Sequence, residues 1–244
     1  MHWWIPTNAS SYGGDVDRIF YIILYITGFV FLVVEGGLLV FLVRYRRREG
    51  RTAAYIHGNN TAEIIWTTIP AVIVVMLALL SQKVWSTVKD PAHFPADAIQ
   101  IGVHVKQFEW QFTMPGPDGT LGTDDDIFRK NELHLVVGRN YAVQLTSQDV
   151  IHSFFIPAFR LKQDVVPGMT IVAWFRPTRT GAFDLACAQL CGVGHYRMQA
   201  TVYVHSAEDF ARWQAAQGTP AAAAAVATDT TMGSMAMPHS GGTR

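Results

Sequence analysis

Residues 19–43 form an almost unbroken apolar run, and this run constrains the chain more than any other feature. Its only charged side chain is Glu35. A helix rises 1.5 Å per residue, so the run spans about 38 Å, which exceeds the roughly 30 Å hydrocarbon core of a bilayer. Only 16% of all residues are charged, against about 25% in soluble domains. These features predict a membrane protein and disfavour an ordinary cytosolic domain.

A second apolar stretch covers residues 64–80 and extends to an interfacial Trp85. It predicts a second membrane-spanning helix. Pro70 lies inside this stretch and leaves a backbone carbonyl without its helical partner, which predicts packing against a neighbouring helix. Glu35 is expected to face protein rather than lipid, because a charge inside a bilayer is costly. A helix–helix contact and a proton path are both open interpretations of Glu35.

The segment between the two spans is rich in arginine: Arg44, Arg46, Arg47, Arg48 and Arg51. Short basic loops stay in the cytoplasm, so both termini are predicted on the opposite side of the membrane. The polar segment 1–18 has no positively charged start, which favours a retained span over a cleaved signal peptide. Nineteen basic residues balance nineteen acidic ones, so no overall field indicates a nucleic-acid partner.

After the predicted two-helix hairpin of residues 19–88, the pattern changes to short alternating runs separated by Gly, Pro and Asp. These runs predict strands of an antiparallel, all-β sandwich or barrel over residues 96–206. The expected strands lie within 99–112, 132–137, 141–147, 152–157, 169–177, 181–186 and 198–205. Residues 207–244 are expected to form a short helix followed by a disordered tail, whose Met232, Met235, Met237 and His239 reflect biased composition.

One short loop carries both cysteines together with a histidine and a methionine: Cys187, Cys191, His195 and Met198. Thiolates, imidazole and thioether are soft donors that suit copper and suit magnesium or calcium poorly. His152 ends an earlier predicted strand, and a sandwich can bring that strand end to the same pole. The sequence therefore assembles two Cys, two His and one Met as candidate metal ligands.

Several chemistries compete for these donors. Cys187 and Cys191 could form a disulfide outside the cytoplasm, or the Cys2His2 set could hold structural zinc. A mononuclear blue-copper site uses one Cys, two His and an axial Met, which leaves the second Cys unexplained. Two thiolates explained together indicate two bridged coppers. Such a symmetric pair shares one electron and suits electron transfer, and it requires neither a general base nor a substrate pocket.

Three features together resemble subunit II of cytochrome c oxidase. They are the Cys-x-x-x-Cys-x-x-x-His-x-x-Met loop at 187–198, the Val-Ile-His-Ser of 150–153, and the paired spans with Glu-Ile-Ile-Trp-Thr-Thr-Ile-Pro at 63–70. This subunit bears the binuclear CuA centre on a cupredoxin-like sandwich. The resemblance covers about residues 15–215. It implies that the coppers are bridged by both thiolates and held by His152, Cys187, Gln189, Cys191, His195 and Met198.

In this ligand set, His152 and the weakly bound Met198 serve one copper. His195 and the backbone carbonyl of Gln189 serve the other. Most family members have Glu at the position of Gln189, where the side chain helps bind magnesium at the interface with subunit I. The neutral amide predicts a weakened magnesium contact, while copper ligation through the carbonyl is expected to survive.

Two further roles follow from the resemblance. Glu63 matches the glutamate at the mouth of a proton-uptake path shared with subunit I, although by position alone it is a helix-start residue. The family's aromatic stretch, whose first Trp receives electrons from cytochrome c, corresponds to residues 107–110. Phe108 replaces that Trp, so Phe108, Trp110 or another surface residue is the expected point of electron uptake.

The resemblance implies an electron-transfer subunit in the bacterial inner (plasma) membrane, with no catalytic residue of its own. It accepts electrons from a c-type cytochrome and passes them to haem in subunit I, where oxygen is reduced to water and protons are pumped. The alternatives are a CuA-bearing subunit of a nitric oxide reductase and a membrane-anchored copper carrier. A quinol oxidase subunit is disfavoured, because such members generally lack the copper ligands.

No Cys-x-x-Cys-His occurs in the sequence, so the electron donor is expected to be another protein. The turn-rich loop 114–126 carries Asp118, Asp124, Asp125 and Asp126. Their spacing misses the EF-hand pattern, which favours a solvated loop over a calcium site. A second hypothesis is that these carboxylates form a landing patch for a basic cytochrome.

Overall fold

The computed structural model describes residues 5–217. The chain divides into two compact units, one of Met1–Ala96 with Ala158–Arg160 and one of Asp97–Pro157 with Leu161–Arg244. The methionine-containing tail, for which the sequence predicts disorder, lies outside the described residues.

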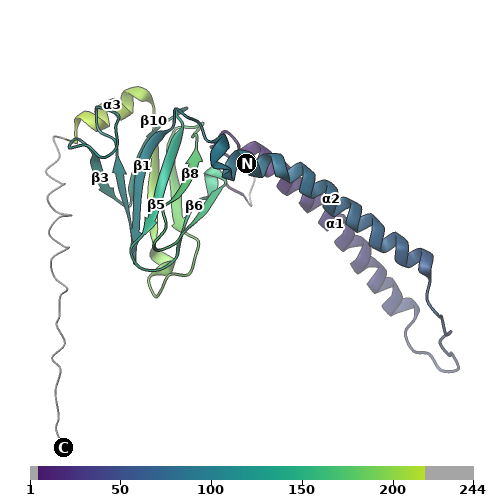
Figure 1. The fold of residues 1–244 in the computed structure, drawn as a ribbon. Coiled ribbons are helices and arrows are strands. Elements are labelled where there is room, and N and C mark those ends of the chain that lie inside the picture. Colours follow the sequence, from purple (N-terminus) through teal and green to yellow (C-terminus); the bar gives the residue numbers. More distant parts are fainter. Residues whose placement is uncertain (1–4, 218–244) are drawn as a thin grey trace, which may run out of the picture. The chain divides into compact units, whose positions relative to one another are not determined.

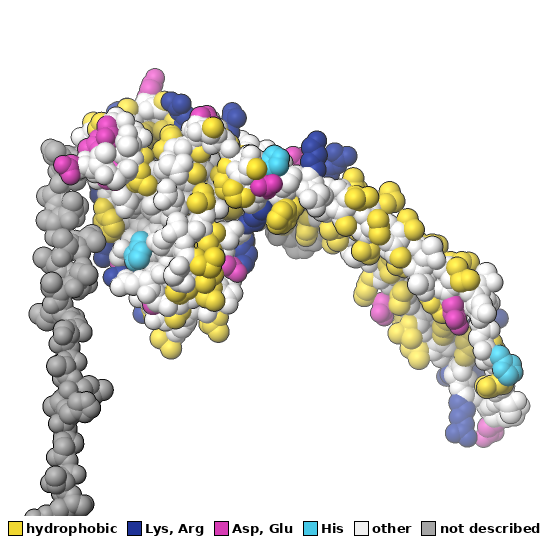
Figure 2. Space-filling model, viewed as in Figure 1, with side chains coloured by type: hydrophobic (Ala, Val, Ile, Leu, Met, Phe, Trp, Pro, Cys, Tyr) yellow, Lys and Arg dark blue, Asp and Glu magenta, His cyan; other side chains and the backbone are white. Residues whose placement is uncertain are grey.

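The first unit is a pair of long helices, α1 (Gly13–Arg44) and α2 (Asn60–Lys89), shown in Figure 1. Both are long and apolar enough to cross a membrane, with a mean hydropathy of 2.4 in their most apolar windows. Hydrophobic side chains cover much of their visible surface (Figure 2). Two membrane-spanning helices were predicted, and both extend beyond the apolar runs that identified them.

The start of α2 explains why a helix begins after the arginine-rich loop. The side chain of Asn59 accepts a hydrogen bond from the Ala62 N–H at 3.0 Å, which satisfies one of the unpaired amide groups at a helix start. Glu63 lies in the first turn, where the positive end of the helix dipole stabilises its negative charge. Pro70 lies inside α2, as the sequence indicates. A 3-10 turn, η1 (Pro91–His93), follows this helix.

The second unit is a sandwich of two five-stranded sheets (Figure 1). The first sheet has the order β3-β2-β1-β5-β8. Its strands are β1 (Ile99–Lys106), β2 (Glu109–Met114), β3 (Ile127–Lys130), β5 (Tyr141–Ser147) and β8 (Ile171–Phe175). The second sheet has the order β4-β10-β9-β6-β7. Its strands are β4 (Glu132–Val136), β6 (His152–Ile156), β7 (Leu161–Val165), β9 (Gly181–Cys187) and β10 (Gln199–His205).

Alternating apolar side chains fill the space between the sheets. The burial pattern of β1 follows the period of two that places every second side chain on the inner face. The fully buried set includes Val105, Phe112, Leu133, Leu135, Val143, Leu145, Phe154, Ile156 and Val202. Truncating such a leucine to alanine costs roughly 2–5 kcal/mol, so this core fixes the strand ends that carry the functional side chains.

Three details of the sandwich differ from the sequence prediction. The strands were expected to be antiparallel throughout, but β1 pairs parallel with β5 and β10 pairs parallel with β4. The run 99–112 is two strands rather than one, because the chain turns at Gln107 and Phe108 between β1 and β2. The strands β3 and β7 were not predicted, because both are short and carry charged residues.

The helix α3 (Ala207–Ala215) lies at one end of the sandwich (Figure 1). It falls within the stretch for which the sequence predicts a short helix, and Ser206 caps its start. Trp213 of α3 stacks on His134, with ring centroids 4.0 Å apart and an interplanar angle of 13°. The Nδ1 atom of His134 lies 2.9 Å from Nε2 of His205. The stacking of Trp213 holds α3 against β4, and the hydrogen bond between the two histidines joins β4 to β10.

The turn-rich loop 114–126, called the acidic loop below, lies at the same end as α3, because Gly116 and Gly119 line one cavity together with Phe210 of α3. It follows Met114, the last residue of β2, whereas the first residue of β2 adjoins the turn at Gln107 and Phe108. Asp125 accepts a hydrogen bond from the Asp118 N–H at 3.0 Å, so this carboxylate holds the loop together. A strand of this length spans roughly 17–20 Å. The loop therefore does not border the cysteine-containing end, and its position does not support the landing-patch hypothesis.

Candidate metal centre

The metal-binding candidates come together where three strands of one sheet meet a loop. His152 begins β6 and Cys187 ends β9, and these strands pair through Phe154 and Cys187. The predicted strand within 152–157 is confirmed as β6, but the expectation that His152 ends an earlier strand was wrong, because residues 148–150 form a bend before β6. The loop after β9 carries Cys191 and leads through the 3-10 turn η3 (His195–Arg197) to β10. Antiparallel pairing of β9 with β6 and β10 thus gathers the donors at one pole.

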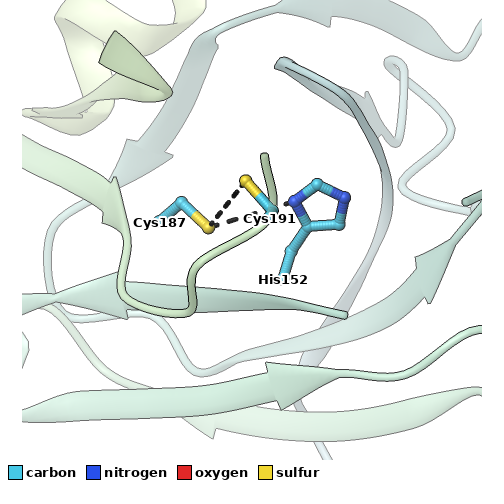
Figure 3. Close-up of side chains that lie close together, drawn as sticks. All are labelled: His152, Cys187 and Cys191. Atoms are coloured by element: carbon cyan, nitrogen blue, oxygen red, sulfur yellow. Dashed lines mark hydrogen bonds between the residues drawn. The ribbon is translucent and has the colours of Figure 1, made fainter. Parts of the chain in front are cut away.

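The two sulfur atoms form the centre of this cluster, as Figure 3 shows for His152, Cys187 and Cys191. Their Sγ atoms are 3.9 Å apart. The Cys187 Sγ lies 3.9 Å from Nδ1 of His152 and 3.2 Å from the carbonyl oxygen of Gln189. The donor atoms of His152, Cys187 and Cys191 all lie within 4.8 Å of one another.

The remaining predicted ligands surround the second sulfur. Nδ1 of His195 lies 3.6 Å from the Sγ of Cys191, and Sδ of Met198 lies 3.7 Å from the same atom. Each of the six predicted donors is thus within 4 Å of a cysteine sulfur. His152 is 0% exposed, and Cys187, Cys191 and Met198 are also buried, whereas His195 is half-buried at the surface.

The two thiols have opposite proton affinities. Burial raises the pKa of both, but at Cys187 the contact with His152 and neighbouring hydrogen bonds outweigh burial and lower the pKa to about 6. At Cys191, burial and the adjacent Cys187 sulfur raise the pKa to about 12. The first thiolate thus opposes formation of the second. A cation between the sulfurs reverses this opposition, because metal binding favours both deprotonated forms.

A carboxylate on the turn before β6 orients the first histidine. Oδ1 of Asp149 lies 2.8 Å from Nε2 of His152, so it fixes the tautomer that leaves Nδ1 facing the sulfur. The other carboxylate oxygen of Asp149 accepts a hydrogen bond from the Gln107 N–H at 2.7 Å. The side chain of Gln107 in turn donates to the carbonyl oxygen of Cys191. The β1–β2 turn therefore connects both sides of the cluster.

Phe108 in this turn and Trp110 in β2 occupy different environments. Phe108 is half-buried and packs on the cysteine loop: a Cβ atom at Gly194 would lie 2.5 Å from Cδ2 of its ring. Trp110 is 0% exposed and meets Phe154 and His152 edge-on, with ring centroids 5.7 and 6.5 Å apart. Phe108 thus lies at the surface beside the loop, and Trp110 lies inside beside a predicted ligand.

The loop that carries the cluster has an apolar outer surface. Leu190, Val193 and Tyr196 are strongly exposed, Val193 to 91%. Figure 2 shows hydrophobic side chains gathered at the end of the sandwich opposite α3. Exposed apolar residues grouped in this way mark surfaces that contact other proteins.

The geometry fits a soft metal and no disulfide. Cys187 and Cys191 are free thiols, and their 3.9 Å separation is below twice a metal–thiolate bond of about 2.3 Å, so both sulfurs can bind one ion. The thioether of Met198 favours copper over structural zinc. Fold and site together define a membrane-anchored β-sandwich protein with a copper-type His–Cys–Cys cluster.

Comparison with known proteins assigns the family. Residues 1–84 match the transmembrane domain of cytochrome c oxidase subunit II, and residues 112–205 match the periplasmic domain of the same subunit. The alternative cytochrome c oxidase subunit 2 of Bradyrhizobium diazoefficiens is 36% identical over 89% of this chain and 84% of its own length. The cytochrome c oxidase subunit 2 of Thermostichus vulcanus is 31% identical over 87% and 78%. The chain belongs to the cytochrome c oxidase subunit II family.

Solved structures of relatives cover the sandwich unit. The periplasmic domain of subunit II of cytochrome oxidase from Bradyrhizobium japonicum is 28% identical, with a TM-score of 0.45, and the match covers 50% of this chain and 95% of that one. A mixed disulfide between a thioredoxin-like protein and a cytochrome c oxidase subunit II contains a chain that is 30% identical, with a TM-score of 0.43. That match covers 50% of this chain and 92% of the other.

Sequence reasoning did not single out Asp149 and Gln107. Asp149 lies three residues before His152, which was a usable signal, because histidine ligands commonly donate their second N–H to a carboxylate. Gln107 acts partly through its backbone, for which its side chain gives no signal. Glu63 and Glu35 lie in the helical unit, and the cluster is built from residues of the sandwich.

Proposed function

We propose that this chain is the electron-transfer subunit of a terminal cytochrome c oxidase. It accepts electrons from a c-type cytochrome at a binuclear CuA centre and passes them to haem in subunit I. Oxygen reduction to water and proton pumping belong to subunit I, and this chain contributes no catalytic residue. One observation carries the proposal: six donor groups converge on two adjacent cysteine sulfurs at one pole of the sandwich.

The proposed ligands divide into bridging and terminal groups. Cys187 and Cys191 would each hold both coppers, and His152, Met198, His195 and the carbonyl oxygen of Gln189 would each hold one. When bound, two coppers bridged in this way supply one-electron redox chemistry with little reorganisation. Burial of His152, both cysteines and Met198 supports a resident centre, since a copper carrier needs exposed donors.

Electron uptake is proposed at the β1–β2 turn. Phe108 combines partial exposure with contact to the cysteine loop. Trp110 lies behind it beside His152 and is fully buried, so it contributes inside the domain rather than at the docking surface. The exposed apolar side chains of Leu190, Val193 and Tyr196 support a protein partner at this pole.

Proton uptake and magnesium binding are proposed for surfaces shared with subunit I. Glu63 lies in the first turn of α2 next to the arginine-rich loop, which suits a proton collector at a cytoplasmic surface. The side chain of Gln189 is exposed and offers a neutral oxygen. We expect a magnesium ion there to be held more weakly than by a carboxylate.

The proposed location is a bacterial inner (plasma) membrane. Two spans joined by a basic loop support a periplasmic side for both termini and the CuA domain, because short basic loops stay in the cytoplasm. Subunit I and other oxidase subunits are the proposed membrane partners, and no nucleic-acid partner is proposed. The copper pole then faces the compartment in which c-type cytochromes are found.

Low-temperature electron paramagnetic resonance with copper quantitation tests the proposal. The full chain is purified in detergent and supplied with copper. A seven-line hyperfine pattern at two coppers per chain is expected for a delocalised pair. A four-line pattern at one copper indicates a mononuclear site and contradicts the proposal, as does failure to retain copper.

A further inference from the structure

Glu35 places a carboxyl group deep in an apolar helix. It lies nine residues before Arg44, the last residue of α1, which corresponds to about 13.5 Å along the helix. The apolar run 19–43 is centred on Phe31, so Glu35 is only about 6 Å from the centre of the span. At that depth, lipid chains offer a carboxyl group no hydrogen-bond partner.

The other helix of the hairpin does not cover Glu35. Ile19 and Ile22 line one cavity together with Leu80 and Val84 of α2, which identifies the face of α1 that meets α2. At roughly 100° per residue, Glu35 lies about 160° around the helix from Ile19 and about 140° from Ile22.

The exposure of residues at the depth of Glu35 agrees with this orientation. Gly37, at the same angle as Ile19 by that spacing, is half-buried, while Glu35 is exposed. Within residues 5–217, no hydrogen bond or ion pair involves the side chain of Glu35. Its partner must therefore come from outside the described chain.

The surface around Glu35 has the shape of a helix-packing face. Gly28 lies seven residues earlier, only about 20° away around the helix, and beyond its own stretch of helix no atom lies within 4 Å of the Cβ position at Gly28. A glycine there lets the backbone of another helix approach closely. Leu24, Phe31 and Leu42 lie within about 40° of Glu35, so apolar side chains flank the carboxyl group along this face.

We propose that the Glu35 face, formed by Leu24, Gly28, Phe31, Glu35 and Leu42, packs against a transmembrane helix of a partner subunit. That helix presents a hydrogen-bond donor or a cation at the depth of Glu35. A second copy of this chain would place two carboxyl groups opposite each other, so a different subunit with complementary charge fits better. The inference rests on the proposed function, because it takes the chain as one subunit of a membrane complex.

Co-purification of the assembled complex from native membranes tests the inference. Glu35→Leu should lower the amount of partner membrane subunits recovered with this chain by roughly three- to tenfold, the range that interhelical hydrogen bonds confer. Glu35→Gln should retain most of the recovery, because an amide still forms hydrogen bonds. Unchanged recovery with Glu35→Leu overturns the proposal.

A variant of the same composition tests whether the position of the carboxyl group on α1 matters, rather than its presence alone. The double substitution Val34→Glu with Glu35→Val keeps the same residues and turns the carboxyl group by about 100°. It should lose recovery as Glu35→Leu does, and recovery equal to the parent chain overturns the proposal. The CuA signal per chain, read on the same samples, should stay unchanged. If the parent chain lacks this signal, the proposed function fails, whatever the recovery.

Photo-crosslinking in the intact complex needs no change at Glu35. A photoreactive phenylalanine analogue at Phe31 should form an adduct with a membrane helix of another subunit, identified by mass spectrometry. The matched control is the same analogue at Val30, about 140° from Glu35, which should give several-fold less of that adduct. Adducts of Phe31 with lipid only, or with a second copy of this chain, overturn the proposal.

Discussion

The two ends of the sandwich each carry a pair of histidines, but in opposite surroundings. At one end, the Nδ1 atoms of His152 and His195 face cysteine sulfurs. At the other end, His134 and His205 hydrogen-bond to each other, and Trp213 stacks over His134. The first pair is oriented toward other donors and can share an ion with them. The second pair has aromatic and imidazole neighbours, which make it part of the cap formed by α3. Neighbours, rather than residue type, distinguish a metal centre from a structural contact.

Cys191→Ser should have the largest effect, because it changes the copper end of the sandwich and leaves the α3 end intact. A hydroxyl is a poor bridge between soft metals, so the variant should lose the mixed-valent dinuclear spectrum altogether. Paramagnetic resonance with copper quantitation measures this. The matched control at the other end is His205→Gln, which should keep the full signal. A dinuclear spectrum that survived Cys191→Ser would rule out bridging by both thiolates.

Asp149→Asn should lower the copper affinity of the cluster without abolishing copper binding. The amide no longer holds the second nitrogen of His152 as a carboxylate does, and loss of such a partner typically lowers metal affinity by about 10- to 100-fold. Competition with a copper chelator measures the affinity. Asp125→Asn in the acidic loop changes the same charge far from the cluster and should leave affinity unaltered. Equal affinity in both variants would show that Asp149 does not support His152.

Acid should destabilise the α3 end through His134. Burial and the nearby His205 lower the pKa of His134 to about 4, from an ordinary value of 6.5. The unfolded chain therefore takes up a proton as pH falls through 6.5, while the folded chain resists protonation until about pH 4. Stability is thus lost as pH falls, by about 2 kcal/mol between pH 7 and 5.

Thermal unfolding of the copper-free full chain in detergent measures this loss. His134→Gln should show a smaller drop in melting temperature between these two pH values, because it removes the titrating group. The difference between the parent chain and this variant isolates His134 from the histidines of the copper end. Identical pH dependence in the two chains would contradict the assignment.

Met198→Leu should have the smallest effect. A thioether is a weak ligand that tunes potential more than it holds metal. Both coppers should remain, and the midpoint potential should shift on the order of tens of millivolts. Redox titration of the dinuclear signal measures the shift, with the exposed Met169→Leu as control. Loss of one copper would make Met198 a structural ligand instead.

The sequence predicted the structure best where the relevant residues lie close together in the chain. An apolar run predicts α1, and the spacing of Cys187, Cys191, His195 and Met198 identifies most of the cluster within one loop. Parallel pairing of β1 with β5 was missed, because it joins strands distant in sequence and leaves no local pattern. The link from Gln107 through Asp149 to His152 was missed for the same reason, since it depends on three separate segments and one backbone N–H.

The strand β10 begins directly after Met198 and ends at His205, so it reaches from the copper end to the α3 end. It is paired on both sides, with β9 and with β4, and its inner face is set by an alternating pattern. Inserting a single residue into β10 reverses every side chain beyond the insertion. The number of residues in β10 therefore sets the distance between the copper end and the α3 end of the sandwich. Insertions or deletions within this strand are expected to be tolerated far less than substitutions.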